Sequence, residues 1–595
     1  MAAKPIDQVA VQLDVPATMR DGTALLANVY RPAGDGRYPV LLTRLPYGKD
    51  LPLGTSYLDP VRAARQGYVV VVQDVRGRFR SGGEWIPFQH EFDDGYDAVE
   101  WAARLPGADG RVAMYGVSYM GMTQWQAAVM QPPSLKALAP GITWGNYLNG
   151  TFFRGGAREL GTAQYWTQTA IAPNVVARRY GADVKQLMER LREVVAVIDD
   201  LPHGYDVLPL SELPDPAGAA RAHREWLAAS LDDPLWRRLN IEGRYDRVRA
   251  PTLHIGGWYD IFLGETLRQY EAMAALHEPG ERRGTPGPRL VVGPWPHGRF
   301  DSLVGELDFG LASSGLFLNY RGSLTDLHLR WYDAVLKGDE AALAGQPPVE
   351  LFVMGENRWR GYDRWPVPGT MPERWYFHGE GHANSRFGDG ALARDRPGQE
   401  PYDSYVYDPG EPVPTIGGAT LMPALLAPGA RDQRANEDRP DVLCYTSAPL
   451  EHDYAVIGPV SATLHAASSA PDTDFVARLV DVYPDGRAVA VTDGIVRASA
   501  RESYPAPGVI RPQPASPIEP DRVYAYAIDL WATAIVFEAG HRLRVEVTSS
   551  SFPRWDRNLN TGRDGLTSRA MAAARQHLFH DAGHPSGITL CALDR

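Results

Sequence analysis

The 595-residue sequence predicts an α/β protein in three parts: a doubly wound core, a helical insertion and a C-terminal all-β region. Three observations lead to this prediction. Short apolar runs alternate with helical patterns over residues 1–145 and again over residues 246–347. Between these stretches, residues 146–245 are helical in pattern and rich in Ala, Arg and Trp. Beyond residue 348, runs of β-forming residues replace the helical pattern.

The first stretch, residues 1–145, has the pattern of a buried sheet. A hairpin signal, Arg20-Asp21-Gly22, separates two strand-like segments. Short apolar runs follow, bounded by Gly, Pro or charged residues, as is typical of buried parallel strands. These runs lie at residues 40–43, 68–73, 112–115 and 135–139. A helical pattern over residues 92–104 separates the second run from the third.

Residues 146–245 are predicted to form a helical cap inserted into the core. Within it, residues 182–198 place five apolar residues on one face of a helix. These residues are Val184, Leu187, Leu191, Val194 and Val195. The core then resumes over residues 246–347, with strands at 251–255 and 290–292 and a helix over 324–336 that Gly338 is suited to terminate.

Residues 348–595 are predicted to form an all-β jelly roll. Segments 475–482, 524–530 and 543–547 alternate or cluster β-forming residues between Gly, Pro and Asp turns.

Composition and motifs exclude several classes of function. The formal net charge of −12 and the absence of Lys/Arg clusters argue against binding of nucleic acid. No apolar run reaches the length of a membrane span, and the N-terminus lacks the apolar region of a signal peptide, so a cytoplasmic location is expected. No GxGxxG or P-loop motif occurs, so no nucleotide cofactor is expected.

The Cys and His residues give no metal pattern, so no metal is expected. Cys444 and Cys591 are predicted to be reduced and buried. His577, His580 and His584 are predicted to be ordinary surface residues.

The segment around Ser118 has the context of a nucleophile elbow. An apolar strand at 112–115 runs into Gly116-Val117-Ser118, and a helix is predicted to begin near Thr123. Methionine stands at position 120, where the usual second glycine would be, and Gly121 follows one residue later. Ser118 is therefore the candidate nucleophile.

Asp260 and His297 are the candidate partners of Ser118. Each follows a predicted core strand, and the order Ser, Asp, His along the chain is that of α/β-hydrolases. Asp260 would orient the imidazole, and His297 would transfer the proton. An alternative interpretation makes Asp260 only the N-cap of a helix that begins near Gly264.

The chain resembles the cocaine esterase family, which is related to X-prolyl dipeptidyl aminopeptidases and α-amino-acid ester hydrolases. The resemblance covers nearly the whole chain. It lies in the segments Arg44-Leu45-Pro46-Tyr47, Gln73-Asp74-Val75-Arg76-Gly77, Gly116 to Trp125, Gly257-Trp258-Tyr259-Asp260, Gly293-Pro294-Trp295-Pro296-His297, Tyr407-Asp408-Pro409, Thr415-Ile416-Gly417-Gly418 and Thr473-Asp474-Phe475. It implies an α/β-hydrolase core with an inserted helical cap and a C-terminal jelly roll.

The resemblance also implies an oxyanion hole and an acyl pocket. Its donors would be the Tyr47 hydroxyl and the N–H of Tyr119, and the residue after the nucleophile donates its N–H in any such elbow. Trp166 and Phe262 occupy positions that resemble the acyl pocket of the family. Trp144 and Tyr165 are further aromatic candidates for the pocket. In the segment Asp74-Val75-Arg76-Gly77-Arg78, an ion pair that braces the site is expected.

The function predicted from the sequence is hydrolysis of carboxylic esters through an acyl-serine, with amides left open. The apolar run Ile261-Phe262-Leu263 after Asp260 favours a neutral acyl group over recognition of a substrate's α-amine. The alternatives are an X-prolyl dipeptidyl peptidase, an α-amino-acid ester or β-lactam acyl hydrolase, and an inert protein that binds ligands through its jelly roll. The expected partner is a small ester or amide, with no nucleic acid and no membrane. Assembly into homo-oligomers is left open.

Overall fold

A computed structural model describes residues 8–218, 221–277, 286–422 and 427–593 of the chain. Within these residues, a ten-stranded sheet forms the core of the N-terminal half, with strands in the order β1-β2-β4-β3-β5-β6-β9-β10-β13-β14. Neighbouring strands from β4 to β13 in this order are parallel, and the outer pairs are antiparallel. This is the predicted α/β-hydrolase core.

The core strands match the short apolar runs of the sequence. All six residues of β4, Val-Val-Val-Val-Gln-Asp, are buried, as expected for a strand covered on both faces. The strands are β1 (Val9–Thr18), β2 (Ala24–Pro32), β3 (Tyr38–Leu45), β4 (Val69–Asp74), β5 (Ala108–Val117), β6 (Leu135–Gly141), β9 (Leu253–Tyr259), β10 (Arg289–Pro296), β13 (Val349–Val353) and β14 (Arg358–Tyr362).

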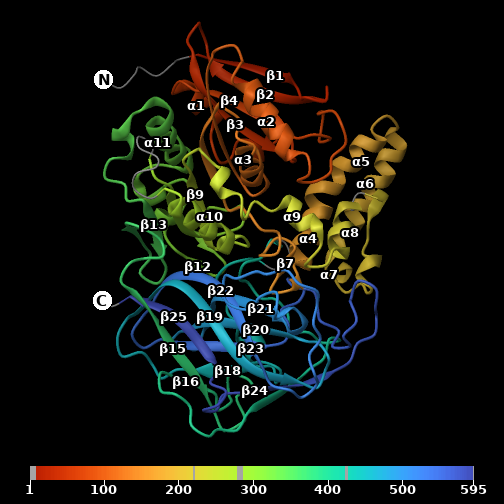
Figure 1. The fold of residues 1–595 in the computed structure, drawn as a ribbon, viewed down its shortest axis with the longest axis vertical. Helices are drawn as coiled ribbons and strands as arrows, with labels where there is room; N and C mark the ends of the chain where they lie inside the picture. Colours follow the sequence, from red (N-terminus) through yellow and green to blue (C-terminus); the bar gives the residue numbers. More distant parts are fainter. Residues whose placement is uncertain (1–7, 219–220, 278–285, 423–426, 594–595) are drawn as a thin grey trace.

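Helices cover both faces of this sheet (Figure 1). One face packs against α2 (Glu91–Ala102) and α3 (Tyr119–Val129), and the other against α1 (Pro60–Arg65) and α11 (Leu324–Lys337). Helix α10 (Leu263–Ala275) follows β9. Gly338 ends α11 with φ 72°, a left-handed conformation that favours glycine, so this predicted helix end is confirmed.

Two strands after residue 347 belong to the core sheet. Strand β13 pairs in parallel with β10, and β14 pairs with β13, although the sequence interpretation starts the jelly roll at residue 348. A short buried run such as β13 has the same pattern in either kind of sheet, so the sequence does not reveal which sheet it joins.

A helical insertion lies between β6 and β9. Its helices are α4 (Leu160–Trp166), α5 (Ala172–Tyr180), α6 (Val184–Asp199), α7 (Leu201–Gly204), α8 (Arg221–Ala228) and α9 (Pro234–Leu239). A π-helical turn, Thr167–Ile171, joins α4 to α5. Among the described helices, none is both long and apolar enough to span a bilayer.

The predicted apolar face of α6 is wrong in part. Val194 is buried, and Leu187 and Leu191 pack beside it, but Val184 and Val195 are exposed. The helix lies at the edge of the molecule and packs mainly on α5 (Figure 1), so only a narrow apolar stripe is covered.

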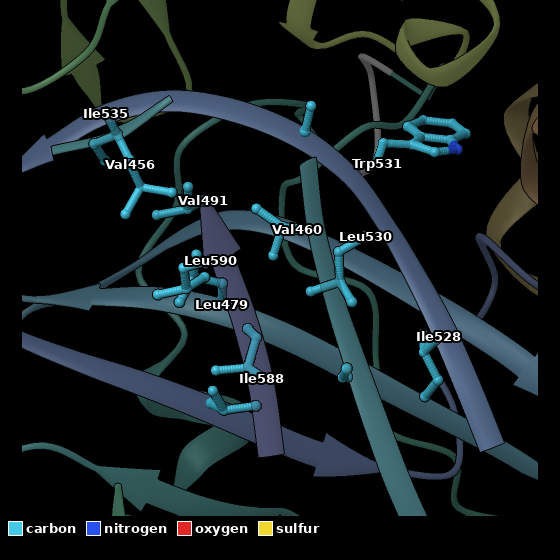
Figure 2. Packing of buried hydrophobic residues seen from close by; sticks show 14 of the residues in the cluster. Val456, Val460, Leu479, Val491, Ile528, Leu530, Trp531, Ile535, Ile588 and Leu590 are labelled. Carbon is cyan, nitrogen blue, oxygen red and sulfur yellow. The ribbon is translucent and has the colours of Figure 1, made fainter. Parts of the chain in front are cut away.

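The C-terminal part is a mostly antiparallel β domain, so the predicted fold class is confirmed. Its central strand β19 pairs with β22, β24 and β25, and Figure 2 shows the apolar side chains packed around it. The strands are β15 (Thr370–His378), β16 (Ala391–Ala393), β17 (Asp403–Tyr407), β18 (Leu443–Thr446), β19 (Tyr454–Ser468), β20 (Asp474–Val482), β21 (Ala488–Arg497), β22 (Tyr524–Phe537), β23 (Arg542–Thr548), β24 (Ala574–Phe579) and β25 (Gly587–Leu593). The short helix α12 (Arg434–Glu437) precedes β18.

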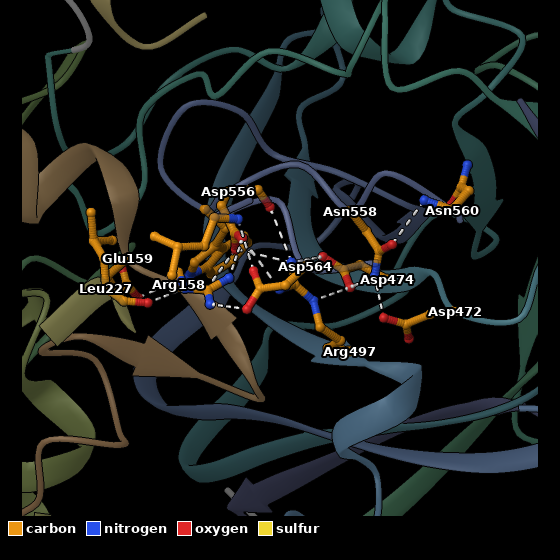
Figure 3. A network of polar contacts seen from close by, with 12 residues as sticks. Arg158, Glu159, Leu227, Asp472, Asp474, Arg497, Asp556, Asn558, Asn560 and Asp564 are labelled. Carbon is orange, nitrogen blue, oxygen red and sulfur yellow. Dashed lines mark hydrogen bonds and ion pairs between the residues drawn. The ribbon is translucent and has the colours of Figure 1, made fainter. Parts of the chain in front are cut away.

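A largely buried charge network joins the insertion to the β domain (Figure 3). Arg158, in the small hairpin of β7 (Phe153–Arg154) and β8 (Ala157–Arg158), pairs with Asp556 and Asp564. Arg497 pairs with Asp474 and Asp556. Because loss of one partner leaves a buried charge unpaired, the network favours one arrangement of the two parts.

Trp531 of β22 forms a second junction between the β domain and the hydrolase core. Its backbone has φ 62°, which is a strained conformation for a bulky residue, and its side chain is buried. The indole donates to Asn149 Oδ1 at 3.1 Å. A Cβ on Gly264 would lie 2.3 Å from the indole nitrogen, so only glycine fits there. The β domain therefore contacts the first turn of α10, close to Asp260.

Candidate active site

Ser118 sits in a strained turn between β5 and α3. Its backbone has φ 56° and ψ −124°, the left-handed region in which a nucleophile elbow holds its serine. A Cβ on Gly116 would lie 2.5 Å from the Met120 Cβ, so glycine is required there. Helix α3 begins at Tyr119, four residues before the predicted start, because the serine itself is the N-cap. Its hydroxyl therefore projects above the carboxyl edge of the sheet.

Ser118, Asp260 and His297 come together at this edge. Ser118 directly follows β5, Asp260 follows β9 and His297 follows β10, and these strands lie close together in the sheet. His297 Nε2 is 2.9 Å from Ser118 Oγ, and His297 Nδ1 is 2.7 Å from Asp260 Oδ2. Because ionised Asp260 can only accept, the Nδ1 nitrogen donates and Nε2 is free to accept the serine proton.

Asp260 does not cap the following helix. The N-cap of α10 is Phe262, and Asp260 Oδ1 accepts the Phe262 N–H at 2.8 Å. The alternative interpretation of Asp260 as a helix cap is therefore wrong. Its two oxygens hold His297 on one side and the backbone of Phe262 on the other, and its side chain is fully buried.

Tyr47 and Tyr119 lie beside Ser118 in different environments. Tyr47 follows β3, and its hydroxyl accepts a hydrogen bond from Trp166 Nε1 at 3.0 Å. Desolvation raises the pKa of Tyr47 to about 12, so the phenol keeps its proton at neutral pH. Tyr119 is the first residue of α3, where a backbone N–H has no acceptor within the helix. The Tyr119 N–H is thus available to a ligand.

The Tyr119 side chain contacts a buried ion pair under the site. Its hydroxyl donates to Glu91 Oε1 at 2.9 Å, and Glu91 Oε2 pairs with Arg44 at 2.7 Å. Burial raises the pKa of Glu91, while the Arg44 guanidinium lowers it.

The ion pair expected from residues 74–78 is formed with a partner outside that segment. Asp74 accepts the Lys49 N–H, and burial raises its pKa to about 7. Arg76 instead pairs with Asp94 of α2 at 2.6 Å. The chain turns between positions 74 and 76, so the two side chains meet different neighbours.

A pocket of about 390 Å³ opens at Ser118. Its wall is mainly aromatic, and it includes all three predicted substrate-binding residues. The lining residues are Tyr47, Phe88, Ser118, Trp144, Thr151, Phe152, Thr162, Ala163, Trp166, Phe262, His297 and Leu421. Tyr165, the other aromatic candidate, packs instead on a separate cluster around Leu160 and Tyr205.

Sequence reasoning missed half of the twelve lining residues, namely Phe88, Thr151, Phe152, Thr162, Ala163 and Leu421. Phe152 lies in the aromatic-rich start of the insertion, and that enrichment is the one signal that pointed to it. Phe88 comes from a loop and has φ 66°, which its sequence does not reveal. Leu421 comes from the β domain, and no local pattern connects it with Ser118.

Among the described residues, no Asp or Glu lines the pocket. Glu265, the nearest carboxylate after Asp260 in the sequence, is buried elsewhere. It accepts the N–H groups of Gly145 and Asn146 at 3.0 and 2.8 Å and the side-chain amide of Asn149 at 2.7 Å. These bonds occupy the carboxylate that could otherwise meet a substrate's amine.

The predictions for the remaining Cys and His residues need two corrections. Cys444 is buried as predicted, but Cys591, also predicted to be buried, is half-buried; both are free thiols. His580, predicted to lie at the surface, is fully buried between Asp403 at 2.8 Å and Glu400 at 3.2 Å. It follows β24, which is paired on both sides by β17 and β19, and its ring turns inward.

Two family models match successive parts of the chain, and the second begins before β13 and β14, the last two strands of the core sheet. Residues 21–299 match the X-Pro dipeptidyl-peptidase (S15) family, and residues 341–589 match the C-terminal non-catalytic domain of X-Pro dipeptidyl-peptidases.

Full-length similarity extends to curated and solved proteins. The chain is 38% identical to the cocaine esterase of Rhodococcus sp. (strain MB1 Bresler), over 98% of this chain and 99% of that protein. An aminopeptidase from a marine sediment Thaumarchaeota archaeon superposes with a TM-score of 0.77 at 25% identity, covering 98% of this chain and 97% of that one. An α-amino acid ester hydrolase shares the fold, with a TM-score of 0.75 at 24% identity over 100% and 98% of the two chains.

Proposed function

This chain belongs to the cocaine esterase family of serine hydrolases, and from that premise we propose that it cleaves small carboxylic esters with an apolar acyl group through an acyl intermediate on Ser118. The observation that supports this most is the Ser118–His297–Asp260 contact at the mouth of an aromatic pocket.

The proposed first step is transfer of the substrate's acyl group to the enzyme. His297 Nε2 takes the hydroxyl proton as Ser118 Oγ attacks the ester carbonyl, and Asp260 stabilises the imidazolium that forms. The carbonyl oxygen becomes an anion, which the Tyr47 hydroxyl and the Tyr119 N–H stabilise. Its collapse releases the alcohol, which takes the proton from His297.

The second step removes the acyl group. Water enters in place of the alcohol, His297 accepts a proton from it, and the resulting hydroxide attacks the acyl carbon. The same two donors hold the second oxyanion. Departure of the carboxylic acid returns Ser118 and His297 to their starting protonation states.

The lining of the pocket supports an ester with a neutral, flat acyl group. Trp144, Trp166 and Phe262 surround the space next to Ser118, and aromatic walls favour apolar groups. Peptidase and amino-ester substrates present an α-ammonium group. Such a group needs an acceptor, and no carboxylate lines the described pocket.

The test is hydrolysis of a five-member panel by the wild type and Ser118→Ala. The panel holds p-nitrophenyl acetate, p-nitrophenyl butyrate, phenyl benzoate, glycyl-prolyl p-nitroanilide and an α-amino-acid methyl ester. We expect ester turnover that is lost in Ser118→Ala and kept in Ser211→Ala, which changes an exposed serine of the insertion. Preference for the dipeptide or the amino ester would reject the proposed substrate class, and turnover that survives Ser118→Ala would reject the nucleophile. Location in the cytoplasm stays a prediction, and assembly into homo-oligomers stays open.

A further inference from the structure

Trp166 and Tyr47 are joined by a hydrogen bond in which the direction is fixed by chemistry. An indole N–H can only donate, whereas a phenol oxygen accepts and also holds one proton of its own. Trp166 Nε1 lies 3.0 Å from the Tyr47 hydroxyl oxygen. The phenol oxygen is therefore the acceptor, and its own proton points away from Trp166.

The phenol's own proton can then point into the pocket that Tyr47 shares with Ser118. Both residues line that pocket. Burial keeps the phenol protonated at neutral pH, because its pKa is about 12. The hydroxyl thus has a donor proton, and the indole restricts where that proton can point.

The elements that bear the two residues are fastened together by Arg78. Its guanidinium donates to the carbonyl of Pro46, directly before Tyr47, at 2.8 Å. It also donates to the carbonyl of Ala170, in the π-helical turn that follows Trp166, at 3.2 Å. The Arg78 side chain is fully buried, so these bonds are protected from water.

The indole ring of Trp166 is held from its faces as well. It stacks on Phe88 with ring centroids 6.1 Å apart and planes 16° apart, and on Trp226 at 6.2 Å and 29°. Its N–H therefore keeps one direction when the pocket is empty. Preorganised donors of this kind stabilise a developing charge without reorientation during the reaction.

We propose that Trp166 is a positioning residue that directs the Tyr47 hydroxyl proton at the oxyanion through its indole N–H. This role is distinct from lining the acyl pocket. The inference rests on the proposed function, in which Tyr47 stabilises the oxyanion.

The test is a double-mutant cycle of Trp166→Phe and Tyr47→Phe, followed by kcat on the preferred ester. Trp166→Phe keeps an aromatic wall and removes the N–H, and kcat should fall about fivefold to tenfold, the factor that one net hydrogen bond represents. In the Tyr47→Phe background the same change should leave kcat unaltered, because the hydroxyl that it directs is gone. Equal effects in both backgrounds would overturn the inference, since they would show that Trp166 acts by packing alone.

Two further variants separate the hydrogen bond from the ring. Tyr165→Phe changes the residue directly before Trp166, which packs outside the pocket, and should leave kcat within about twofold of the wild type, less than one net hydrogen bond represents. Replacement of Trp166 by 3-benzothienylalanine keeps the indole shape and exchanges the N–H for sulfur, so it serves if Trp166→Phe folds poorly. It should reproduce the loss in kcat, and full activity would overturn the inference. Ser118→Ala tests the proposed function separately, so an inactive Ser118→Ala with an additive cycle rejects only the role of Trp166.

Discussion

Glu91 accepts a hydrogen bond from the Tyr119 hydroxyl at 2.9 Å while its other oxygen pairs with Arg44 at 2.7 Å. The residue proposed to stabilise the oxyanion through its N–H is thus anchored by its side chain to a buried ion pair. All three side chains are essentially inaccessible to water. The charged groups that anchor Tyr119 therefore lie beneath the edge of the sheet and outside the pocket.

Glu91→Gln should strongly destabilise the fold. The amide can still accept from Tyr119, but the Arg44 guanidinium is left buried without a counter-charge. Removal of one partner of such a pair costs about 3–5 kcal/mol. Urea unfolding measures the loss, and Glu193→Gln is the control because its pair with Arg190 is exposed. Equal midpoints for Glu91→Gln and the control would contradict this reasoning.

Asp260→Asn should lower kcat by about 10⁴, with KM little changed. The amide oxygen can keep the Phe262 N–H bond, but the residue no longer carries the charge that stabilises the His297 imidazolium. Steady-state kinetics on the preferred ester give the value. Asp301→Asn, an exposed carboxylate just after His297, should behave as wild type. A near-normal kcat in Asp260→Asn would mean that another group orients the histidine.

Tyr47→Phe should lower kcat by about 10²–10³, the loss typical of one oxyanion donor. The ring and its edge contact with Tyr119 remain, so KM should change little. The matched control is Tyr165→Phe, which removes a hydroxyl in the insertion outside the pocket. If both variants turn over like the wild type, the oxyanion receives its second hydrogen bond from a group other than Tyr47.

The buried imidazole of His254 should make stability sensitive to acid. Burial lowers its pKa to about 3, against about 6.5 in the unfolded chain. Between these values the unfolded state binds the extra proton. Through His254 alone, the free energy of unfolding therefore falls by about 1.4 kcal/mol for each pH unit from about pH 6.5 down to about pH 3, and it does not change above pH 6.5.

His254→Gln should remove that part of the acid slope. Urea unfolding of the wild type and the variant between pH 4 and 8 measures this effect. The difference between their free energies of unfolding should shrink as the pH falls. His203→Gln changes a largely exposed imidazole and should leave the slope unaltered. Parallel wild-type and His254→Gln curves would contradict the lowered pKa.

The sequence is most informative about the site where a catalytic candidate directly follows a core strand, because the strand then sets the position of that residue. Ser118, Asp260 and His297 each follow a buried apolar run, and parallel strands bring their carboxyl ends to one edge, so their proximity could be predicted. The fold class could also be predicted, and it is confirmed, because the spacing of apolar residues and the positions of turn residues are signals within short segments.

Relationships between distant segments are not visible in such patterns. The contact of Glu91 with Tyr119 depends on how α2 packs on α3, and the burial of His580 depends on Asp403 from another strand. Strand β13 joins the core sheet because it pairs with β10, a strand from an earlier segment of the chain. Each is decided by tertiary packing, which a single sequence does not encode in its periodicity.

Leu421 places a residue of the β domain in the wall next to Ser118. The wall of this pocket is therefore built from three separate stretches of the polypeptide, the core, the insertion and the β domain. A directed-evolution library confined to the catalytic half would leave one side of the pocket unsampled. Exchange of the C-terminal half between relatives would, conversely, alter substrate preference without touching the catalytic residues.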